Sequence, residues 1–206
     1  MSMTIKKAVV LLSGGMDSAT CLAIAKSEGY DCYALSFNYG QKQIAELAAA
    51  KKIAANFDTA HQIIDISSLS KIARSALTQQ DLAIPDFEQR NEVPITYVPA
   101  RNTIMISFAL SYAESLEAEC IFIGASAIDY SGYPDCRPEY FTKFEELIAL
   151  ATKAGINGQA IRIKTPLIAL SKAQTIEAGI KLGIDYRDTI TCYRADTSGK
   201  ACGTCD

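Results

Sequence analysis

The sequence predicts an α/β fold in three layers, a doubly wound parallel five-stranded sheet with helices on both faces. Three observations lead to this prediction. Strand-like and helical segments alternate up to Ile66, in a β-α-β-α-β order that is typical of parallel strands with right-handed crossovers. A short, fully apolar run at 120–124 is typical of a buried central strand. The first strand passes through a Ser-Gly-Gly turn directly into a helix.

Composition and charge limit the classes of function. The 206 residues include 49% hydrophobic and 21% charged residues, which is ordinary for one globular domain. The formal net charge of −3 argues against a nucleic-acid partner. No apolar run approaches the roughly 20 residues of a membrane helix, and no signal peptide is visible. We therefore expect a cytoplasmic protein without a membrane or nucleic-acid partner.

The first strand, 8–12, leads into Ser13-Gly14-Gly15-Met16-Asp17-Ser18 and then a helix that ends near Gly29. Adjacent glycines allow the backbone to approach a ligand closely, and the helix directs free N–H groups and the positive end of its dipole at the turn. Ser13 and Ser18 add hydroxyl groups, and Asp17 offers a carboxylate to a metal ion. This turn predicts a site for a phosphate chain, with an ordinary strand-to-helix turn as the alternative.

The second and third strands are expected at 31–37 and 61–66, on either side of a helix at 43–57. Ligands of open parallel sheets bind at the carboxyl ends of the strands. The loop 38–41 lies at such an end, and it either contacts adenine and ribose or is a surface turn. His61, the single histidine, is interpreted as structural.

The middle of the chain predicts less regular structure. A short helix is expected at 68–77, a polar lid or disordered loop at 78–92, and an extended segment with two prolines at 93–99. Arg101 opens a long helix that runs to about Glu117. An arginine in the first turn opposes the helix dipole, so Arg101 is interpreted as facing an anion, with a solvated side chain as the alternative.

After the central strand, the sequence predicts a loop rich in functional residue types. The expected elements are a loop at 127–139, a helix at 140–154, a strand at 159–164, and a helix that Ser171 and Lys172 begin and that runs to about Leu182. In the loop, Tyr130 and Tyr133 offer faces for stacking, Asp129 and Asp135 could accept hydrogen bonds from a guanine-like edge, and Arg137 could pair with a carboxylate. A generic turn explains these residues equally well.

Several segments together resemble a known family. The first turn resembles the Ser-Gly-Gly-x-Asp-Ser loop of the PP-loop ATP pyrophosphatases. The chain as a whole resembles the 7-cyano-7-deazaguanine synthase (QueC) family in 12–22, 36–41, 98–102, 129–139, 165–167 and 170–172. The resemblance implies an adenine nucleotide alpha hydrolase-like fold, a homodimer, ATP, a structural zinc ion, and 7-carboxy-7-deazaguanine and ammonium as substrates. A PP-loop enzyme of tRNA thiolation and a non-catalytic nucleotide-binding module are the alternatives.

The resemblance also implies roles for individual residues. Asp17, Arg101 and Lys172 are expected to act in catalysis, with Mg²⁺ as a cofactor, and Lys172 has a plain surface lysine as its alternative. Tyr130, Tyr133, Asp135 and Arg137 are expected to bind the substrate. The expected ATP-binding residues are Leu12, Ser13, Gly14, Gly15, Met16, Asp17, Ser18, Ala19, Thr20, Cys21 and Leu22.

Three cysteines near the end of the chain predict a metal site. Cys202 and Cys205 form a Cys-x-x-Cys pair, and Cys192 adds a third thiolate. Thiolates at such spacing suit zinc, and a redox pair is the alternative. The family pattern has a fourth cysteine three residues after Cys205, so Asp206, a water or a partner residue could be the fourth ligand. We expect a nucleotide-binding domain at 1–190 and a zinc-binding segment at 191–206, in one compact unit.

Overall fold

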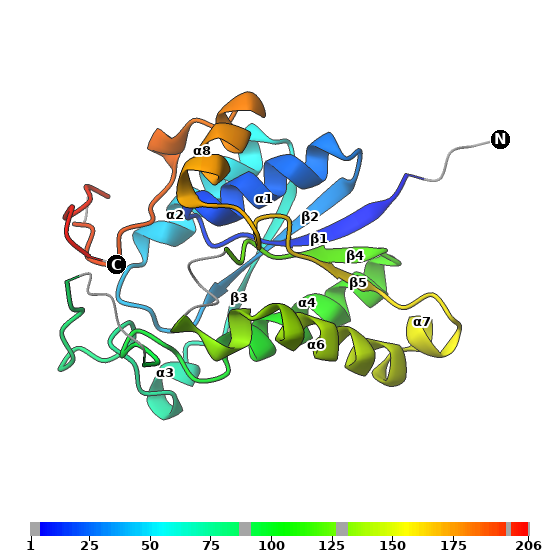
Figure 1. Cartoon of the computed structure of the whole chain (residues 1–206), viewed down its shortest axis with the longest axis horizontal. Helices are drawn as coiled ribbons and strands as arrows, with labels where there is room; N and C mark the ends of the chain where they lie inside the picture. The colour runs from blue at the N-terminus through cyan, green and yellow to red at the C-terminus, as the bar shows by residue number, and fades with distance from the viewer. Residues whose placement is uncertain (1–4, 87–91, 127–131, 197–198, 206) are drawn as a thin grey trace.

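A five-stranded parallel sheet lies at the centre of the molecule, with its strands in the order β3-β2-β1-β4-β5 (Figure 1). The computed structural model describes residues 5–86, 92–126, 132–196 and 199–205. The predicted fold class is confirmed. The strands are β1 (Lys7–Leu11), β2 (Asp31–Asn38), β3 (Ala60–Asp65), β4 (Cys120–Phe122) and β5 (Arg162–Lys164).

Helices cover both faces of this sheet and complete the three layers. In Figure 1, α1 (Met16–Ser27), α2 (Ala45–Asn56) and α8 (Lys172–Lys181) lie above the sheet, and α4 (Arg101–Leu116) and α6 (Pro138–Ala151) lie below it. No helix in the described ranges has both the length and the apolar character needed to cross a membrane. The remaining elements are short: α3 (Leu69–Ile72), α7 (Lys153–Ile156), and the 3₁₀ helices η1 (Pro134–Cys136) and η2 (Tyr186–Asp188).

The core is divided between the two faces of the sheet. Successive side chains of a strand point to opposite faces, so Val9 packs in the cluster on the α4 side, and Ala8 and Val10 pack in the cluster on the α1 side. All three are fully buried, as are Ile121 and Phe122 of β4. Burial on both faces explains why β1 and β4 read as continuous apolar runs rather than alternating ones.

Two predicted helices differ from the structure because hydroxyl groups bind the backbone nearby. The helix predicted at 68–77 ends at Ile72, and the Ser75 hydroxyl donates to the carbonyl of Thr96 over 3.0 Å, which draws the chain off the helical path. The helix predicted at 140–154 begins earlier, at Pro138, and is interrupted at Thr152. Thr152 is extended and accepts the N–H of Gly155 over 2.9 Å, so it caps the separate helix α7.

Three further predictions differ from the structure. The segment predicted as extended at 93–99 contains turns, one of which is closed by the Tyr97 N–H on the Pro94 carbonyl over 2.9 Å. Proline restricts the residue before it, and Ile95 and Thr96 are free of that restriction. The loop predicted at 127–139 contains η1, and the last strand has only the three residues of β5.

The strand order creates a switch point beside β1. The chain runs outward from β1 to β2 and β3, then returns to the other side of β1 for β4 and β5. In open sheets of this kind the turns after the two strands at the switch diverge and leave a crevice between them. The turn that begins at Leu12 and the turn that begins at Ile123 therefore frame the expected binding site.

Candidate functional site

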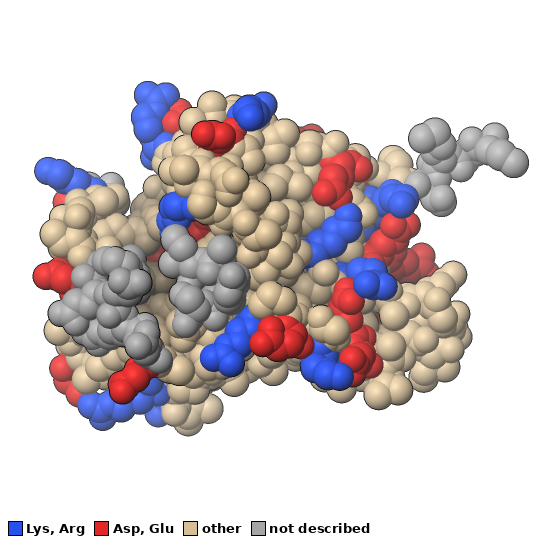
Figure 2. Space-filling model, in the orientation of Figure 1, with Lys and Arg blue, Asp and Glu red and all other residues tan. Residues whose placement is uncertain are grey.

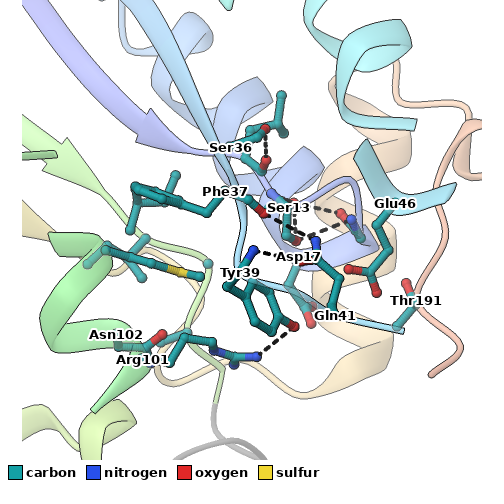
Figure 3. Close-up of a pocket in the computed structure, with 18 of the residues that line it drawn as sticks. Ser13, Asp17, Ser36, Phe37, Tyr39, Gln41, Glu46, Arg101, Asn102 and Thr191 are labelled. Carbon is teal, nitrogen blue, oxygen red and sulfur yellow. Dashed lines mark hydrogen bonds between the residues drawn. The ribbon is translucent and has the colours of Figure 1, made fainter. Parts of the chain in front are cut away.

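A cavity of about 220 Å³ occupies the crevice at the carboxyl ends of β1, β2 and β4. Its walls come from the turn after β1 with the start of α1, the turn after β2, α2, the start of α4, and the segment 190–193. Figure 3 shows labelled side chains from all of these elements facing one space. The position matches the one that the switch point predicts.

The turn after β1 is held in shape by two serine hydroxyls (Figure 3). The Ser18 hydroxyl accepts the Ser13 N–H over 3.1 Å and donates to the Gly15 carbonyl over 2.9 Å, and the Ser13 hydroxyl lies 3.0 Å from it. Gly14 has a φ of +95°, which L-residues with a side chain rarely adopt. The bend aims the start of α1, with its N–H groups and positive dipole end, at the cavity, as an anion site requires.

The predicted ATP-binding stretch divides into two parts. Leu12, Ser13, Gly15, Met16, Asp17 and Ser18 line the cavity. The others do not line it: Gly14 packs against α2, and Ala19, Thr20, Cys21 and Leu22 are fully buried within α1. The first group is placed to contact a ligand, and the second supports the helix behind it.

The segment after α8 binds the turn at residues 13–18, which is called the phosphate turn below because it is predicted to hold phosphates. Nothing in the sequence indicates this contact. The Ile190 N–H donates to the Gly14 carbonyl over 3.0 Å, and the Thr191 hydroxyl accepts the Met16 N–H over 3.0 Å. Thr191 therefore caps the first turn of α1 from 175 residues away. Ile190, Thr191 and Tyr193 also line the cavity.

The three predicted catalytic residues lie around this turn. Asp17 lines the cavity, and its carboxylate lies 3.7 Å from the ammonium of Lys172, the first residue of α8. The Lys172 side chain is 45% exposed, so the pair adds little stability and leaves the lysine accessible to an anion. Arg101 lines the cavity from the opposite side, in the first turn of α4.

Arg101 is held at the cavity by the Tyr39 side chain. It donates to the Tyr39 hydroxyl over 3.3 Å, and its guanidinium carbon lies 5.5 Å from the Tyr39 ring centre. Burial alone would lower the pKa of Arg101, but Tyr39, Tyr193 and Tyr133 outweigh it and raise that pKa, so the group stays charged. The placement fits the predicted role of Arg101 toward an anion.

The turn after β2 and the helix after it supply three further cavity residues, Tyr39, Gln41 and Glu46. Gln41 is buried, accepts the Tyr39 N–H over 2.9 Å and donates to the Phe37 carbonyl over 3.2 Å, so this turn is fixed. Burial raises the pKa of Glu46 to about 7, and Arg101 only partly opposes that rise. Within an alanine-rich helix, nothing in the sequence marks this glutamate.

The predicted substrate residues are distributed differently. Tyr133 lines the cavity, and its hydroxyl lies 2.8 Å from that of Thr96. Asp135 is buried outside it and accepts the Asn102 N–H over 3.0 Å at the start of α4. Arg137 is exposed and does not line the cavity. Tyr130 lies outside the described residues, as does Asp129.

The three predicted zinc ligands meet at one point. The sulfur atoms of Cys192, Cys202 and Cys205 all lie within 4.8 Å of one another. The Cys202 sulfur accepts the N–H groups of Thr204 over 3.5 Å and Cys205 over 3.3 Å. These bonds, that of Thr204 above all, lower the pKa of Cys202 to about 5 and favour the thiolate. Three convergent cysteine sulfurs fit a tetrahedral zinc site, and Asp206, one of the possible fourth ligands, is outside the described residues.

Metal analysis tests this cysteine cluster. Protein purified without chelator is expected to carry about one zinc ion per chain, because three convergent thiolates bind zinc tightly. Cys202→Ser should reduce the zinc content to below half an equivalent, and Lys200→Gln in the same segment should leave it unchanged. Less than half an equivalent in the unaltered protein would remove the zinc assignment.

Known proteins match this chain along nearly its whole length. The model of the family "Queuosine biosynthesis protein QueC" matches residues 7–206. The 7-cyano-7-deazaguanine synthase of Coxiella burnetii (strain RSA 331 / Henzerling II) is 60% identical over 201 residues, which are 98% of this chain and 89% of the relative. The synthase of Legionella pneumophila (strain Corby) is 56% identical over 202 residues, 98% of this chain and 88% of the relative.

A solved structure supports the fold independently. The NMN synthetase of Francisella tularensis aligns with a TM-score of 0.57 and 19% sequence identity, over 98% of this chain and 71% of that one. At this level of identity the likeness concerns the arrangement of strands and helices only.

Proposed function

Because the chain belongs to the QueC family of queuosine biosynthesis proteins, we propose that it is an ATP-dependent 7-cyano-7-deazaguanine synthase. It joins ammonium to 7-carboxy-7-deazaguanine and forms the nitrile. The observation that carries the proposal is that the phosphate turn, Asp17 and Arg101 all line one cavity. A turn for the phosphates and a cation opposite it are what the activation of a carboxylate by ATP requires.

The chemistry follows from the two oxygen atoms that the substrate must lose. The substrate carboxylate attacks the α-phosphate of ATP, which forms an acyl adenylate and releases pyrophosphate. Ammonia then displaces AMP and gives the amide. A second activation, of the amide oxygen, and a second loss of AMP give the nitrile. Each of the two activations makes a substrate oxygen part of AMP, which is a much better leaving group than oxide or hydroxide.

The residues of the site have different roles in these steps, according to their positions. The N–H groups at the start of α1 and the hydroxyls of Ser13 and Ser18 hold the phosphates. Arg101 lines the cavity and Lys172 lies 3.7 Å from Asp17 in the phosphate turn, and both neutralise charge on the phosphates. Asp17 is the residue that would hold Mg²⁺, which supplies further charge neutralisation at the pyrophosphate when bound.

Recognition of the deazaguanine base is assigned to the far end of the cavity. Tyr133 offers a stacking face there, and the Tyr97 ring lies 6.3 Å from it and supports its position. Asp135 contributes indirectly, because its carboxylate accepts a backbone N–H and holds the start of α4 in place. Direct roles of Tyr130 and Arg137 in substrate binding stay part of the proposal.

The remaining features of the proposal concern the whole protein. It includes a structural zinc ion at the cysteine cluster, a homodimer, a cytoplasmic location, and the division into a nucleotide-binding domain at 1–190 and a zinc-binding segment at 191–206. A nucleic-acid partner is not part of it. On the face in Figure 2, basic and acidic groups are interspersed over the described residues, rather than gathered in one basic field.

Product analysis tests the proposed function. Incubation with 7-carboxy-7-deazaguanine, ammonium, ATP and Mg²⁺ is expected to yield the nitrile by mass spectrometry, together with AMP and pyrophosphate. Omission of ammonium should stop product formation, and omission of ATP should stop it as well. Transfer of sulfur to tRNA without nitrile formation would instead assign the chain to tRNA thiolation, and ATP binding without any product would make it a non-catalytic module.

A further inference from the structure

A second, smaller cavity lies next to the nucleotide cavity. It measures about 10 Å³, which is close to the space that one water-sized molecule needs. The two cavities share Tyr39, Gln41, Glu46 and Tyr193 as walls. A molecule the size of ammonium would fit this side cavity, where it would lie against the four residues that also line the nucleotide cavity.

Glu46 is the one acidic side chain among the described residues that line the side cavity. Its polar neighbours are already engaged: the Gln41 amide bonds the backbone of Tyr39 and Phe37, and the Lys42 ammonium donates to the Leu82 carbonyl over 2.6 Å. Within the described ranges no hydrogen bond or ion pair is made by the Glu46 carboxylate itself. That carboxylate is therefore the group that a small cation would meet.

The fold fixes this carboxylate relative to the phosphate turn. Helix α2 packs so closely on the turn that a Cβ atom at Gly14 would lie 2.1 Å from the Glu46 carbonyl oxygen. Tyr39 and Tyr193 line the same space, and aromatic residues can attract ammonium groups. Figure 3 shows Glu46 reaching from α2 into the space that Tyr39 and Asp17 also border.

We propose that the side cavity is the ammonium site and that the Glu46 carboxylate takes a proton from ammonium before the attack. This inference rests on the proposed function. One N–H bond of ammonium breaks, its electron pair stays on nitrogen, and the proton moves to a carboxylate oxygen of Glu46. The ammonia lone pair then forms the C–N bond, the bond from the acyl carbon to the AMP oxygen breaks, and AMP leaves with that electron pair. The nitrogen releases its surplus proton to water.

The charged surroundings set the pH at which this base works. The positive charge of Arg101, from α4, favours the ionised form of Glu46. Asp17, from α1, lines the nucleotide cavity with Glu46. Tyr39, Tyr193 and Lys42 line the side cavity with Glu46. Burial dominates and raises the pKa of Glu46 to about 7. A raised carboxyl pKa means that the base is protonated below that pH, so ammonium-dependent kcat/KM should rise as the pH rises through about 7.

Glu46→Gln tests the proposal, because glutamine keeps the shape and cannot accept the proton. At pH 8 we expect kcat/KM for ammonium to fall at least about 100-fold, the usual scale for loss of a general base. Hydroxylamine is largely neutral at this pH and needs no base, so hydroxamate formation from the acyl adenylate should change less than about 2-fold. The affinity for ATP with Mg²⁺, measured by calorimetry, should also stay the same. Glu146→Gln, at an exposed pair with Lys143, is the matched control.

The outcomes separate this inference from the function on which it rests. Equal losses with ammonium and hydroxylamine would place Glu46 in adenylation or metal binding and overturn the ammonium site. Unchanged ammonium kinetics in Glu46→Gln would overturn it as well. If the unaltered protein forms neither amide nor nitrile from ammonium but still makes hydroxamate, the proposed function fails first and the ammonium site fails with it.

Discussion

Asp17→Asn is expected to lower ATP-dependent turnover by at least about 100-fold, the scale at which single electrostatic groups contribute to transition states. Asp17 lines the cavity in the first turn of α1 and faces Lys172 at 3.7 Å. Asparagine keeps the shape but removes the charge that would hold Mg²⁺ at the pyrophosphate and balance the lysine. Steady-state release of pyrophosphate, with saturating substrate and ammonium, measures the effect.

The fold should survive this substitution, because the pair with Lys172 is partly exposed and contributes little stability. A thermal midpoint within about 3 °C of the unaltered protein is therefore expected, equivalent to about 1 kcal/mol in a chain of this size. Asp81→Asn removes a carboxylate from an exposed pair with Arg74 and should leave both turnover and stability unchanged. Normal turnover in Asp17→Asn would refute the catalytic assignment of this residue.

Gly14→Ala is expected to destabilise the fold by about 3 kcal/mol or more, since it combines a backbone clash with a strained φ. The added Cβ would lie 2.1 Å from the Glu46 carbonyl oxygen and 2.9 Å from the Ala50 nitrogen. Both are backbone atoms of α2, so no side-chain rotation can relieve the contact. The thermal midpoint should fall by about 6–12 °C, as scanning calorimetry would show.

Gly29→Ala is the matched control for the clash. Gly29 also has a positive φ, +83°, yet nothing lies within 4 Å of the Cβ it would gain. Gly29→Ala should lower the free energy of unfolding only by the backbone strain, about 1–2 kcal/mol. If both variants lose the same stability, the close packing of α2 on the phosphate turn is not what requires glycine at position 14.

The parts of the site that could be predicted are those encoded by local sequence. The residues from Ser13 to Ser18 form a contiguous strand–turn–helix unit, so the backbone conformation follows from their order. Arg101 is expected to face an anion because a cation in the first turn of a helix is unfavourable unless an anion binds there, and it lines the cavity. Both positions line the cavity at the carboxyl ends of the central strands.

The parts that could not be predicted depend on packing between distant segments. Glu46 looks like an ordinary solvated residue of an alanine-rich helix, and only the docking of α2 on the phosphate turn brings it to the cavity. Thr191 has no sequence signal because its partner is Met16 at the other end of the chain. The contact that Asp135 makes also depends on packing, since its carboxylate accepts the Asn102 N–H at the start of α4.

The bond between Thr191 and Met16 has a consequence for the order in which the protein matures during synthesis. The ribosome makes the phosphate turn among the first segments, but its last partner is added 175 residues later. A nascent chain without residues 190 and 191 lacks the cap on α1 and the bond to Gly14. Affinity for nucleotide should therefore arise late in translation, after the strands of the sheet have already been made.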